Sequence, residues 1–523
     1  MSRYPASKHF EKLYWKLKDL APHADQNKSH IIVLSGERTG YRNDTDRELI
    51  FRQESNFFWL SGCDLPGSHL VLYYDFGRTS GSFKQHLFIP EEDPLEVLWS
   101  PAPPNMEEAR KMYDVTEISF SKDFQSVLTD VLKNHPQHIL HVLPSSSLYP
   151  SHPDTVATCL QPSTDQYLLT ALHQVRLIKD EYEISLIRKA NEISSRAHEV
   201  VMRLLGQGVR DLEIRSNGVP NGKKVNRPLM PHEWRIHHEA EAEAVFVASC
   251  RREGSIHQAY LPIVAASTRA STLHYCCNDK QFSWGPDIHS DADLEHDHQE
   301  CLAPQVLLID AGCEWRNYAS DITRVTPVGN GGKFSPEARA IYATVLKMQL
   351  ACIEAAKPGV HWDHLHLKSH EILVEELIKL GILVGDYKTV LESGVSAAFY
   401  PHGLGHSLGM DVHDCPSASK PTENKTIPAS SSQNPEFYRY LRLRLPLAEN
   451  MVVTIEPGCY FSPHQLAPVR NSPYINQQVL SRYEYVGGVR IEDVVLITAN
   501  GCEVLTPVGK DIEWLEAVAS GSI

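Results

Sequence analysis

Three histidines stand close together in a glycine-rich stretch, residues 401–414, which reads PHGLGHSLGMDVHD. Imidazole is the side chain that binds metals and transfers protons near neutral pH, and glycine permits a tightly curved backbone. A single histidine would most often be a hydrogen-bonded structural residue. Three of them so close together, His402, His406 and His413, predict a site for metal binding or proton transfer.

A pair of aspartates lies in the segment VLLIDAGCEWRNYASDITRV, residues 306–325. We expect a β-hairpin centred on Trp315 and Arg316, which sets Asp310 directly opposite Asp321 with both side chains on one face. Two ionised carboxylates in that position repel each other unless a cation lies between them. The alternative is an irregular turn that sends one aspartate into solvent.

Two further acids follow apolar, β-branched runs: Glu456 in MVVTIEPG and Glu492 in VRIEDVV. Each alone would more often lie on the surface at a strand end, because a buried carboxylate is costly unless it is paired or binds a metal. Together with Asp310 and Asp321 they carry four negative charges, which two divalent cations would neutralise. Oxygen-rich ligation with one histidine favours Mn²⁺ or a similar ion, and two such ions can activate a bridging water as a nucleophile.

These segments resemble, in order along the chain, the motifs of the aminopeptidase P and prolidase family of dinuclear metallopeptidases. The matching segments are LIDAGCEWRNYASDITR, PHGLGHSLGMDVHD, TIEPGCYF and GGVRIEDVVLIT. The resemblance covers most of residues 165–510, and FRQESNFFWLSGCDLPGSHLV near the N-terminus is similar to the amino-terminal domain of that family. It implies an α/β N-terminal domain followed by an α+β catalytic domain with the pita-bread fold.

Position by position, the resemblance implies five ligands for two divalent ions: Asp310, Asp321, which would bridge them, His406, Glu456 and Glu492. It implies catalytic roles for Glu456, His402 and His413, and contact with substrate for His274, His413, Arg490 and Tyr460. Glu456 would accept a proton from the water and pass it to the leaving nitrogen. In an Xaa-Pro bond that nitrogen becomes an amine that must be protonated to depart.

The implied activity is that of an Xaa-Pro aminopeptidase, which releases the N-terminal residue of peptides with proline in second position. A dipeptidase restricted to Xaa-Pro dipeptides shares the motifs, but it must bind a free proline carboxylate, and no residue of the sequence dedicates the site to that group. A non-enzymatic pita-bread interaction module is a second alternative, which the five filled ligand positions disfavour.

A third alternative comes from GHSLG, residues 405–409, which formally matches the nucleophile elbow of serine hydrolases. That elbow needs a strand running straight into it. Pro401, Gly403 and Gly405 interrupt the approach, so the metal site is the stronger interpretation.

The elements that must position these residues fall into two predicted domains, 1–165 and 166–515. Between residues 30 and 144, the apolar runs HIIVLSG, NFFWLSG, HLVLYYDF, KQHLFIP and HILHVLP alternate with polar stretches and helical pieces such as NMEEARKMY, as expected of an α/β domain. An amphipathic helix at residues 180–205 opens the second domain, with AVFVAS, VLLIDAG and MVVTIEPG as strands and PEARAIYATVLKMQLACIEAA as a helix. Residues 215–236 and 280–304 look like insertions relative to the family.

Composition indicates the environment of these domains. The 523 residues carry a formal net charge of −15 without a Lys/Arg cluster, so neither nucleic acid nor a membrane is expected as a partner. The N-terminus lacks an apolar signal core, and the eleven cysteines form no C-x-x-C pair, which favours the cytoplasm. The resemblance further implies a homodimer.

Overall fold

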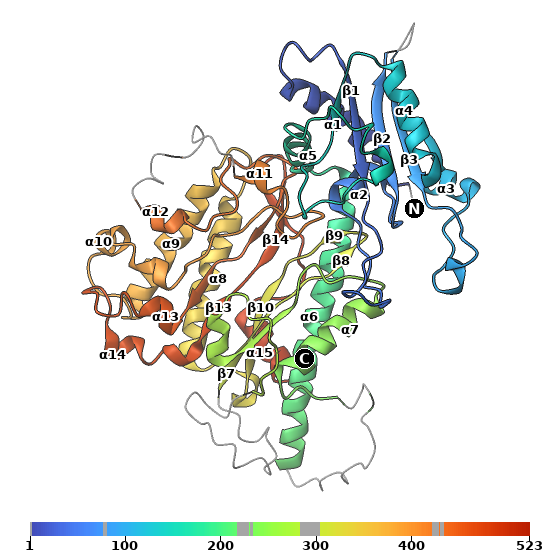
Figure 1. Cartoon of the computed structure of the whole chain (residues 1–523). Helices are drawn as coiled ribbons and strands as arrows, with labels where there is room; N and C mark the ends of the chain where they lie inside the picture. The colour runs from blue at the N-terminus through green and yellow to red at the C-terminus, as the bar shows by residue number, and fades with distance from the viewer. Residues whose placement is uncertain are drawn as a thin grey trace. The chain divides into compact units, whose positions relative to one another are not determined.

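The computed structural model describes residues 3–76, 81–216, 230, 234–282, 304–420, 428 and 434–523. The chain divides into two compact units, Met1–Arg176 and Leu177–Ile523 (Figure 1). Most of residues 215–236 and 280–304, which the sequence suggested as insertions, lie outside the described residues.

The N-terminal unit is built on a mixed five-stranded sheet in the order β4-β3-β2-β1-β5. Its strands are β1 Ser29–Ser35, β2 His69–Asp75, β3 Ser82–Ile89, β4 Glu117–Phe120 and β5 His138–His141. The central strands β1, β2 and β3 are antiparallel, whereas β5 and β4 pair in parallel with β1 and β3. The predicted α/β class is confirmed.

Helices cover both faces of this sheet. Ile31 and Val33 of β1 pack in one cluster with Leu128 of α4, Phe124–Asn134. On α1, Ala6–Leu20, Phe10 meets Phe83 of β3 edge to face. The other helices are α3, Met106–Met112, and α5, Leu168–Arg176.

One apolar run expected among the strands of this unit is a helix. NFFWLSG forms most of α2, Ser55–Ser61, whose side chains are all buried. Burial on every side removes the periodicity that separates a helix from a strand. The residues at its two ends favour the helix. Glu54 accepts a hydrogen bond from the Phe57 amide at the N-cap, and Gly62 ends the helix in the left-handed region.

The C-terminal unit has a three-stranded antiparallel sheet at its centre, with β7, Gln305–Asp310, between β10, Thr323–Val328, and β6, Ile263–Ala266. Successive side chains of β7 point to opposite faces, and all are buried. Leu307 packs in one cluster with α6, Glu181–Ser216, and α7, Glu239–Arg252. Leu308 packs in another with α8, Pro336–Ala355, and α9, Trp362–Lys379. Figure 1 shows these two helix pairs on either side of the central strands, as expected of the pita-bread fold.

Further strands of this unit are β8 Glu314–Trp315, β9 Tyr318–Ala319, β11 Val452–Ile455, β12 Gly458–Tyr460, β13 Gly488–Arg490, β14 Asp493–Ile497 and β15 Cys502–Val504. In the described part of this unit, β11, β14 and β15 form a second three-stranded sheet, and β12–β13 and β8–β9 form two-stranded sheets. The remaining helices are α10 Tyr387–Glu392, α11 Pro416–Ser419, α12 Pro435–Tyr438, α13 Pro463–Leu466, α14 Gln477–Leu480 and α15 Ile512–Ala519. The strands expected from VLLIDAG and MVVTIEPG are β7 and β11, and the two long helices expected from sequence are α6 and α8.

The strand expected from AVFVAS is wrong, because these residues lie within α7. The buried positions of α7 include Ala242, Val245, Phe246 and Cys250, which share one helical face. Acidic residues in the first turn and arginines in the last favour the helix through its dipole. Among the described helices, none combines the length and the apolar character that a membrane span requires.

Candidate metal centre and active site

The two aspartates lie on one β-hairpin but not directly opposite each other. β7 pairs with β10 so that Asp310 faces Thr323. In the same register, Asp321 falls opposite Gly312. The predicted direct opposition is wrong by two residues, and an even slip keeps both aspartates on the same face of the hairpin.

The turn explains the slip. Trp315 pairs with Tyr318, so the two turn residues are Arg316 and Asn317 rather than Trp315 and Arg316. Both have positive φ, 51° and 65°. Two-residue hairpins favour this conformation, and asparagine adopts it readily. Asn317 was therefore the sequence signal that could have fixed the register.

A tyrosine and an arginine hold the aspartates in place. The Tyr260 hydroxyl lies 2.5 Å from Oδ1 of Asp310 and 2.5 Å from Oδ1 of Asp321. Arg490 donates from Nη2 to Oδ2 of Asp310 at 2.6 Å and from Nε to the Thr323 hydroxyl at 3.0 Å. Arg490, expected to contact substrate, is thus a buried partner of an aspartate.

The two glutamates also face each other. β11 and β14 pair Ile455 with Asp493, and β12 and β13 continue in the same register, so Glu456 and Glu492 lie opposite each other where the ladder breaks. The Thr323 hydroxyl donates to Oε2 of Glu492 at 2.7 Å. Oε1 of Glu492 is buried without a hydrogen-bond partner among the described residues. A buried carboxylate oxygen with no donor needs a partner from outside the chain, such as a bound cation or a water molecule.

The glycine-rich stretch brings His406 to the glutamates by running alongside β11. The Thr454 amide donates to the His406 carbonyl at 2.9 Å, and the His406 amide donates to the Thr454 hydroxyl at 3.1 Å. A Cβ on Gly405 would lie 2.0 Å from the Thr454 carbonyl oxygen. Gly405 thus permits close approach of two backbones, whereas tight curvature was expected.

The five residues expected as ligands come together in one cluster. Ligand atoms of Asp321, His406 and Glu492 all lie within 4.8 Å of one another. Nε2 of His406 is 3.3 Å from Oδ2 of Asp321 and 3.5 Å from Oε1 of Glu456. Asp310 is joined to them through the tyrosine hydroxyl described above.

The burial and mutual repulsion of the carboxylates in this cluster favour the binding of cations. Burial, followed by repulsion from neighbouring carboxylates, raises the pKa of Asp321, Glu456 and Glu492 well above the usual range. Burial also lowers the pKa of His406 to about 4, which leaves the imidazole neutral and able to bind a metal. Four acids and one imidazole fit two oxygen-preferring divalent cations, which would remove the repulsion.

A hydrogen-bonded chain runs from Arg490 to His402. Nη1 of Arg490 donates to the Tyr460 hydroxyl at 2.9 Å, and that hydroxyl lies 2.8 Å from Nε2 of His402. Because the arginine only donates, the tyrosine proton points to Nε2, and Nδ1–H of His402 donates to the Gly403 carbonyl at 2.9 Å. Both ring nitrogens of His402 are therefore bonded within the chain, and burial lowers its pKa to about 3.

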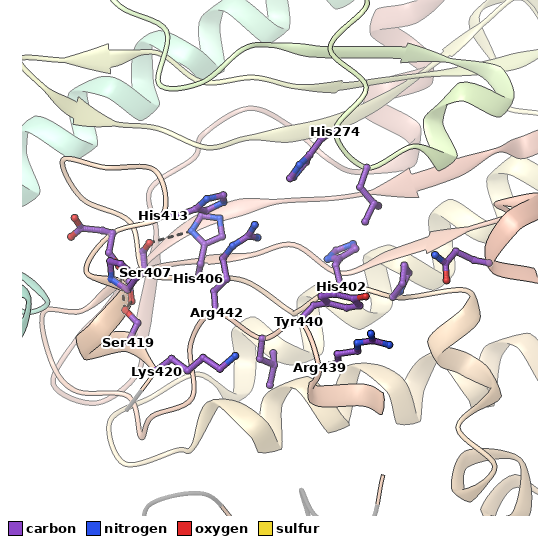
Figure 2. A pocket seen from close by; sticks show the side chains of 16 residues that line it. His274, His402, His406, Ser407, His413, Ser419, Lys420, Arg439, Tyr440 and Arg442 are labelled. Carbon is purple, nitrogen blue, oxygen red and sulfur yellow. Dashed lines mark hydrogen bonds between the residues drawn. The ribbon is translucent and has the colours of Figure 1, made fainter. Parts of the chain in front are cut away.

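Two adjoining pockets open beside the cluster. The inner cavity, about 250 Å³, is lined by Tyr260, Leu261, Ile263, His274, Cys276, Asp310, Asp321, His406, Val412, His413, Arg442, Glu456 and Glu492. The outer pocket, about 660 Å³, shares four of these residues: His274, His406, His413 and Arg442 (Figure 2). The shared residues place the outer pocket at the mouth of the acidic cavity.

His274 and His413 belong to both pockets. Both are exposed, and neither has a hydrogen-bond partner among the described residues. The His413 ring meets the His406 ring edge to face, with centroids 4.4 Å apart. Desolvation of the His413 ring by the pocket wall lowers its pKa to about 3. The two imidazoles are available to bond an arriving molecule.

The serine-hydrolase alternative does not fit the structure. Ser407 is buried, and its hydroxyl lies 2.8 Å from that of Ser419. It forms an isolated bridge with Val453 instead of standing on a strand-to-helix turn. An elbow serine would need an exposed hydroxyl and a histidine base.

Sequence reasoning missed Tyr260 and Arg442. Tyr260 lies 50 residues before the nearer aspartate that it bonds and belongs to no recognisable motif. Arg442 lines both pockets, but one arginine in YRYLRLRLP is not distinguishable from its neighbours by pattern. Only the folded chain identifies either residue.

Comparison with known families agrees with this geometry. Residues 185–499 match metallopeptidase family M24, and residues 8–141 match the N-terminal domain of aminopeptidase P.

Similar proteins cover the whole chain. A probable Xaa-Pro aminopeptidase of Podospora anserina is 38% identical over 526 residues, covering 99% of this chain and 98% of its own. One of Aspergillus clavatus is 37% identical, with coverage of 99% and 98%. Among solved structures, aminopeptidase PepP of Pseudomonas aeruginosa is 29% identical with a TM-score of 0.71, over 100% of both chains. A zinc-substituted Escherichia coli aminopeptidase P in complex with product is 25% identical with a TM-score of 0.71, over 99% of both.

Proposed function

The chain belongs to metallopeptidase family M24, and from this premise we propose that it is an Xaa-Pro aminopeptidase, which hydrolyses the bond between the N-terminal residue of a peptide and a following proline. The observation that carries the proposal is the cluster of four carboxylates and one imidazole that lines a cavity adjoining a larger pocket. The combined size of the two pockets, about 250 and about 660 Å³, favours a peptide over a dipeptide.

The proposed ligands of two divalent cations are Asp310, Asp321, His406, Glu456 and Glu492. The unbonded Oε1 of Glu492 and the facing pair of glutamates support this set. When bound, the cations would polarise the scissile carbonyl and make a water more acidic. We assign them as Mn²⁺, because oxygen-rich ligation with a single imidazole suits that ion, although a zinc-substituted relative exists.

The remaining steps of the proposed mechanism belong to the chain itself. Glu456 accepts the proton of the attacking water and returns it to the proline nitrogen as the bond breaks. Its Oε2 lies 3.8 Å from Nδ1 of His402, whose orientation Tyr460 and Arg490 fix. His402 can donate its Nδ1 proton to the glutamate once its bond to the Gly403 carbonyl opens.

His274 and His413 are proposed to bind the substrate. Their free imidazoles at the mouth of the inner cavity can donate to the carbonyl oxygens on either side of the scissile bond. Because His413 lies against the His406 ring, the carbonyl that it binds would be held next to the cation site.

We further propose that the enzyme acts in the cytoplasm as a homodimer. The ten cysteines of the described part are all free thiols, which supports a reducing compartment. The family resemblance supports the dimer.

The test is product analysis by mass spectrometry. The Mn²⁺-loaded protein receives Ala-Pro and Ala-Pro-Ala-Ala side by side, with a chelated sample and Asp321→Asn as controls. Release of alanine from the tetrapeptide, abolished in both controls, is the expected result. Cleavage of the dipeptide alone would indicate a dipeptidase, and cleavage of neither would favour a non-enzymatic module.

A further inference from the structure

The outer pocket is lined by positive charges, whereas the net charge of the whole chain is negative. The chain has a formal net charge of −15, yet Lys420, Arg439 and Arg442 all line this pocket. In Figure 2 the side chains of Lys420 and Arg439 lie below, and Arg442 lies between them and the histidines. Three cations on the wall of one concave pocket create a local positive field in a chain whose net charge is negative.

Little in the described structure neutralises these charges. Asp414 is the one acid that lines the pocket, and it is buried against Lys179 at 2.9 Å, with both side chains 1% exposed. Arg439 reaches Glu436 only at 4.0 Å, and both side chains are largely exposed, so the pair is weak. Arg442 has no ion-pair partner among the described residues.

Bound cations would leave the two pockets with different charges. The four carboxylates that line the inner cavity would be neutralised, whereas the basic wall of the outer pocket, which begins at the shared Arg442, keeps its positive charge. A peptide that has its scissile bond at the cation site and extends into the outer pocket therefore meets positive charge beyond that bond. A carboxylate suits this environment.

We propose that Lys420 and Arg439, with Arg442, select peptides that carry a carboxylate in the residues following the proline. This inference rests on the proposed function. The carboxylate can come from an aspartate or glutamate side chain or from the C-terminus of a short peptide. The contacts lie away from the reacting bond, so they stabilise bound substrate and transition state equally and act on KM rather than kcat.

The two sources of the carboxylate are separated by a set of four peptides. Ala-Pro-Glu-Ala-amide, Ala-Pro-Gln-Ala-amide and Ala-Pro-Lys-Ala-amide isolate the side chain, and Ala-Pro-Gln-Ala with a free C-terminus isolates the terminal carboxylate. We expect kcat/KM of the Mn²⁺-loaded enzyme at low salt to be about tenfold higher for the glutamate than for the lysine peptide. The ratio should fall towards one in 1 M salt, where the screening length is about 3 Å.

The double variant Lys420→Gln, Arg439→Gln should reduce the glutamate-to-lysine ratio at low salt to near one, with bound metal unchanged by elemental analysis. Lys357→Gln, Lys388→Gln is the matched control, because it removes the same charge from exposed lysines that do not line the pocket, and it should keep the ratio. Equal kcat/KM for the four peptides, or a ratio that the first variant leaves intact, would overturn the proposal. Failure to cleave any of the peptides would instead refute the proposed function.

Discussion

At the scale of single residues, the hydroxyl of Tyr260 joins the two aspartates of the cluster. A phenol has one proton, so it can donate to only one of the two aspartates that it contacts. Arg490 also donates to Asp310, whereas burial and the charge of Asp310 raise the pKa of Asp321 well above its usual range. Tyr260 therefore links a carboxylate that Arg490 stabilises to one whose charged form is disfavoured.

Tyr260→Phe tests this arrangement. Removing the hydroxyl leaves the two aspartates without their common partner, and loss of an outer-shell hydrogen bond of this kind typically costs about 10–100-fold in metal affinity or activity. We expect a reduction of that size in kcat/KM, with an unchanged circular dichroism spectrum. Tyr485→Phe is the matched control, since that hydroxyl bonds Ser335 and Glu337 instead. Equal activity of the two variants would show that the hydroxyl is dispensable.

At the scale of elements, the β7–β10 hairpin sets the spacing of the aspartates, and Gly312 allows it to close. A Cβ at Gly312 would lie 1.9 Å from the Ser320 carbonyl oxygen. Both strands would have to separate to admit it, which would move Asp321 away from Asp310.

Gly312→Ala should accordingly reduce both activity and stability. We expect a loss of roughly 1–3 kcal/mol in unfolding free energy from overpacking. A displacement of about 1 Å at a catalytic site is worth roughly a hundredfold in rate. Gly501→Ala, where an added Cβ meets nothing within 4 Å, should change neither quantity. Urea denaturation and steady-state kinetics on both variants test this prediction. A fully active Gly312→Ala would mean that the hairpin does not fix the spacing of the two aspartates.

Asp493, which follows the proposed ligand Glu492, links β14 to neighbouring segments. Its carboxylate bonds Nη2 of Arg324 at 2.7 Å, Nζ of Lys510 at 2.5 Å and the Thr506 hydroxyl at 2.5 Å. Although burial opposes ionisation, these partners lower the pKa of Asp493 to about 2 from a reference of 3.8.

The sign of this shift predicts a pH dependence. A depressed pKa contributes stability that is fully present above about pH 4 and is lost as the pH falls towards 2. Asp493→Asn should lower the unfolding free energy by about 3–5 kcal/mol at pH 7, because it leaves buried cations unpaired. The deficit should shrink below pH 4. Glu503→Gln, which breaks the exposed pair with Arg188, should cost under about 1 kcal/mol in the same urea titrations. A deficit independent of pH would refute the assignment.

At the scale of the whole molecule, the destabilising burial and repulsion of the acidic cluster are confined to one unit. All five proposed ligands belong to Leu177–Ile523, so cations that bind only the folded chain should stabilise that unit. Because the acid pKa values are raised, protons compete with cations at low pH, and metal affinity should rise with pH.

Hydrogen exchange with and without Mn²⁺ measures this effect. Added metal should slow exchange in peptides that contain the proposed ligands and leave residues 29–141 unchanged. The protection should be larger at pH 8 than at pH 6 after correction for the intrinsic exchange rate. Asp321→Asn should lose most of the response, while being more stable than the parent chain in chelator because one repelling charge is gone. Equal protection of both units would contradict a single metal centre in the C-terminal unit.

The sequence by itself determined the chemistry and most of the architecture. Acids after apolar runs, together with clustered histidines, are rare enough to indicate the donor cluster, because each buried charge must be compensated. The α/β and α+β domains followed from periodicity, whose signal is strong in long amphipathic helices such as α6. It failed for α2, a short segment buried on every side, and for α7, whose apolar run AVFVAS resembles a strand although its buried residues have helical spacing.

Only the tertiary structure decided how these residues meet. The register of the aspartate hairpin depended on two positive φ angles at Arg316 and Asn317. Tyr260 comes from a segment far from the aspartates that it bonds, and folding brings Lys420, Arg439 and Arg442 together around the outer pocket. The motifs contain acids and histidines whose burial is unfavourable unless they are compensated, so their pattern is recognisable in the sequence. A tyrosine or a surface lysine is compatible with many positions, so its role becomes visible only in the folded chain.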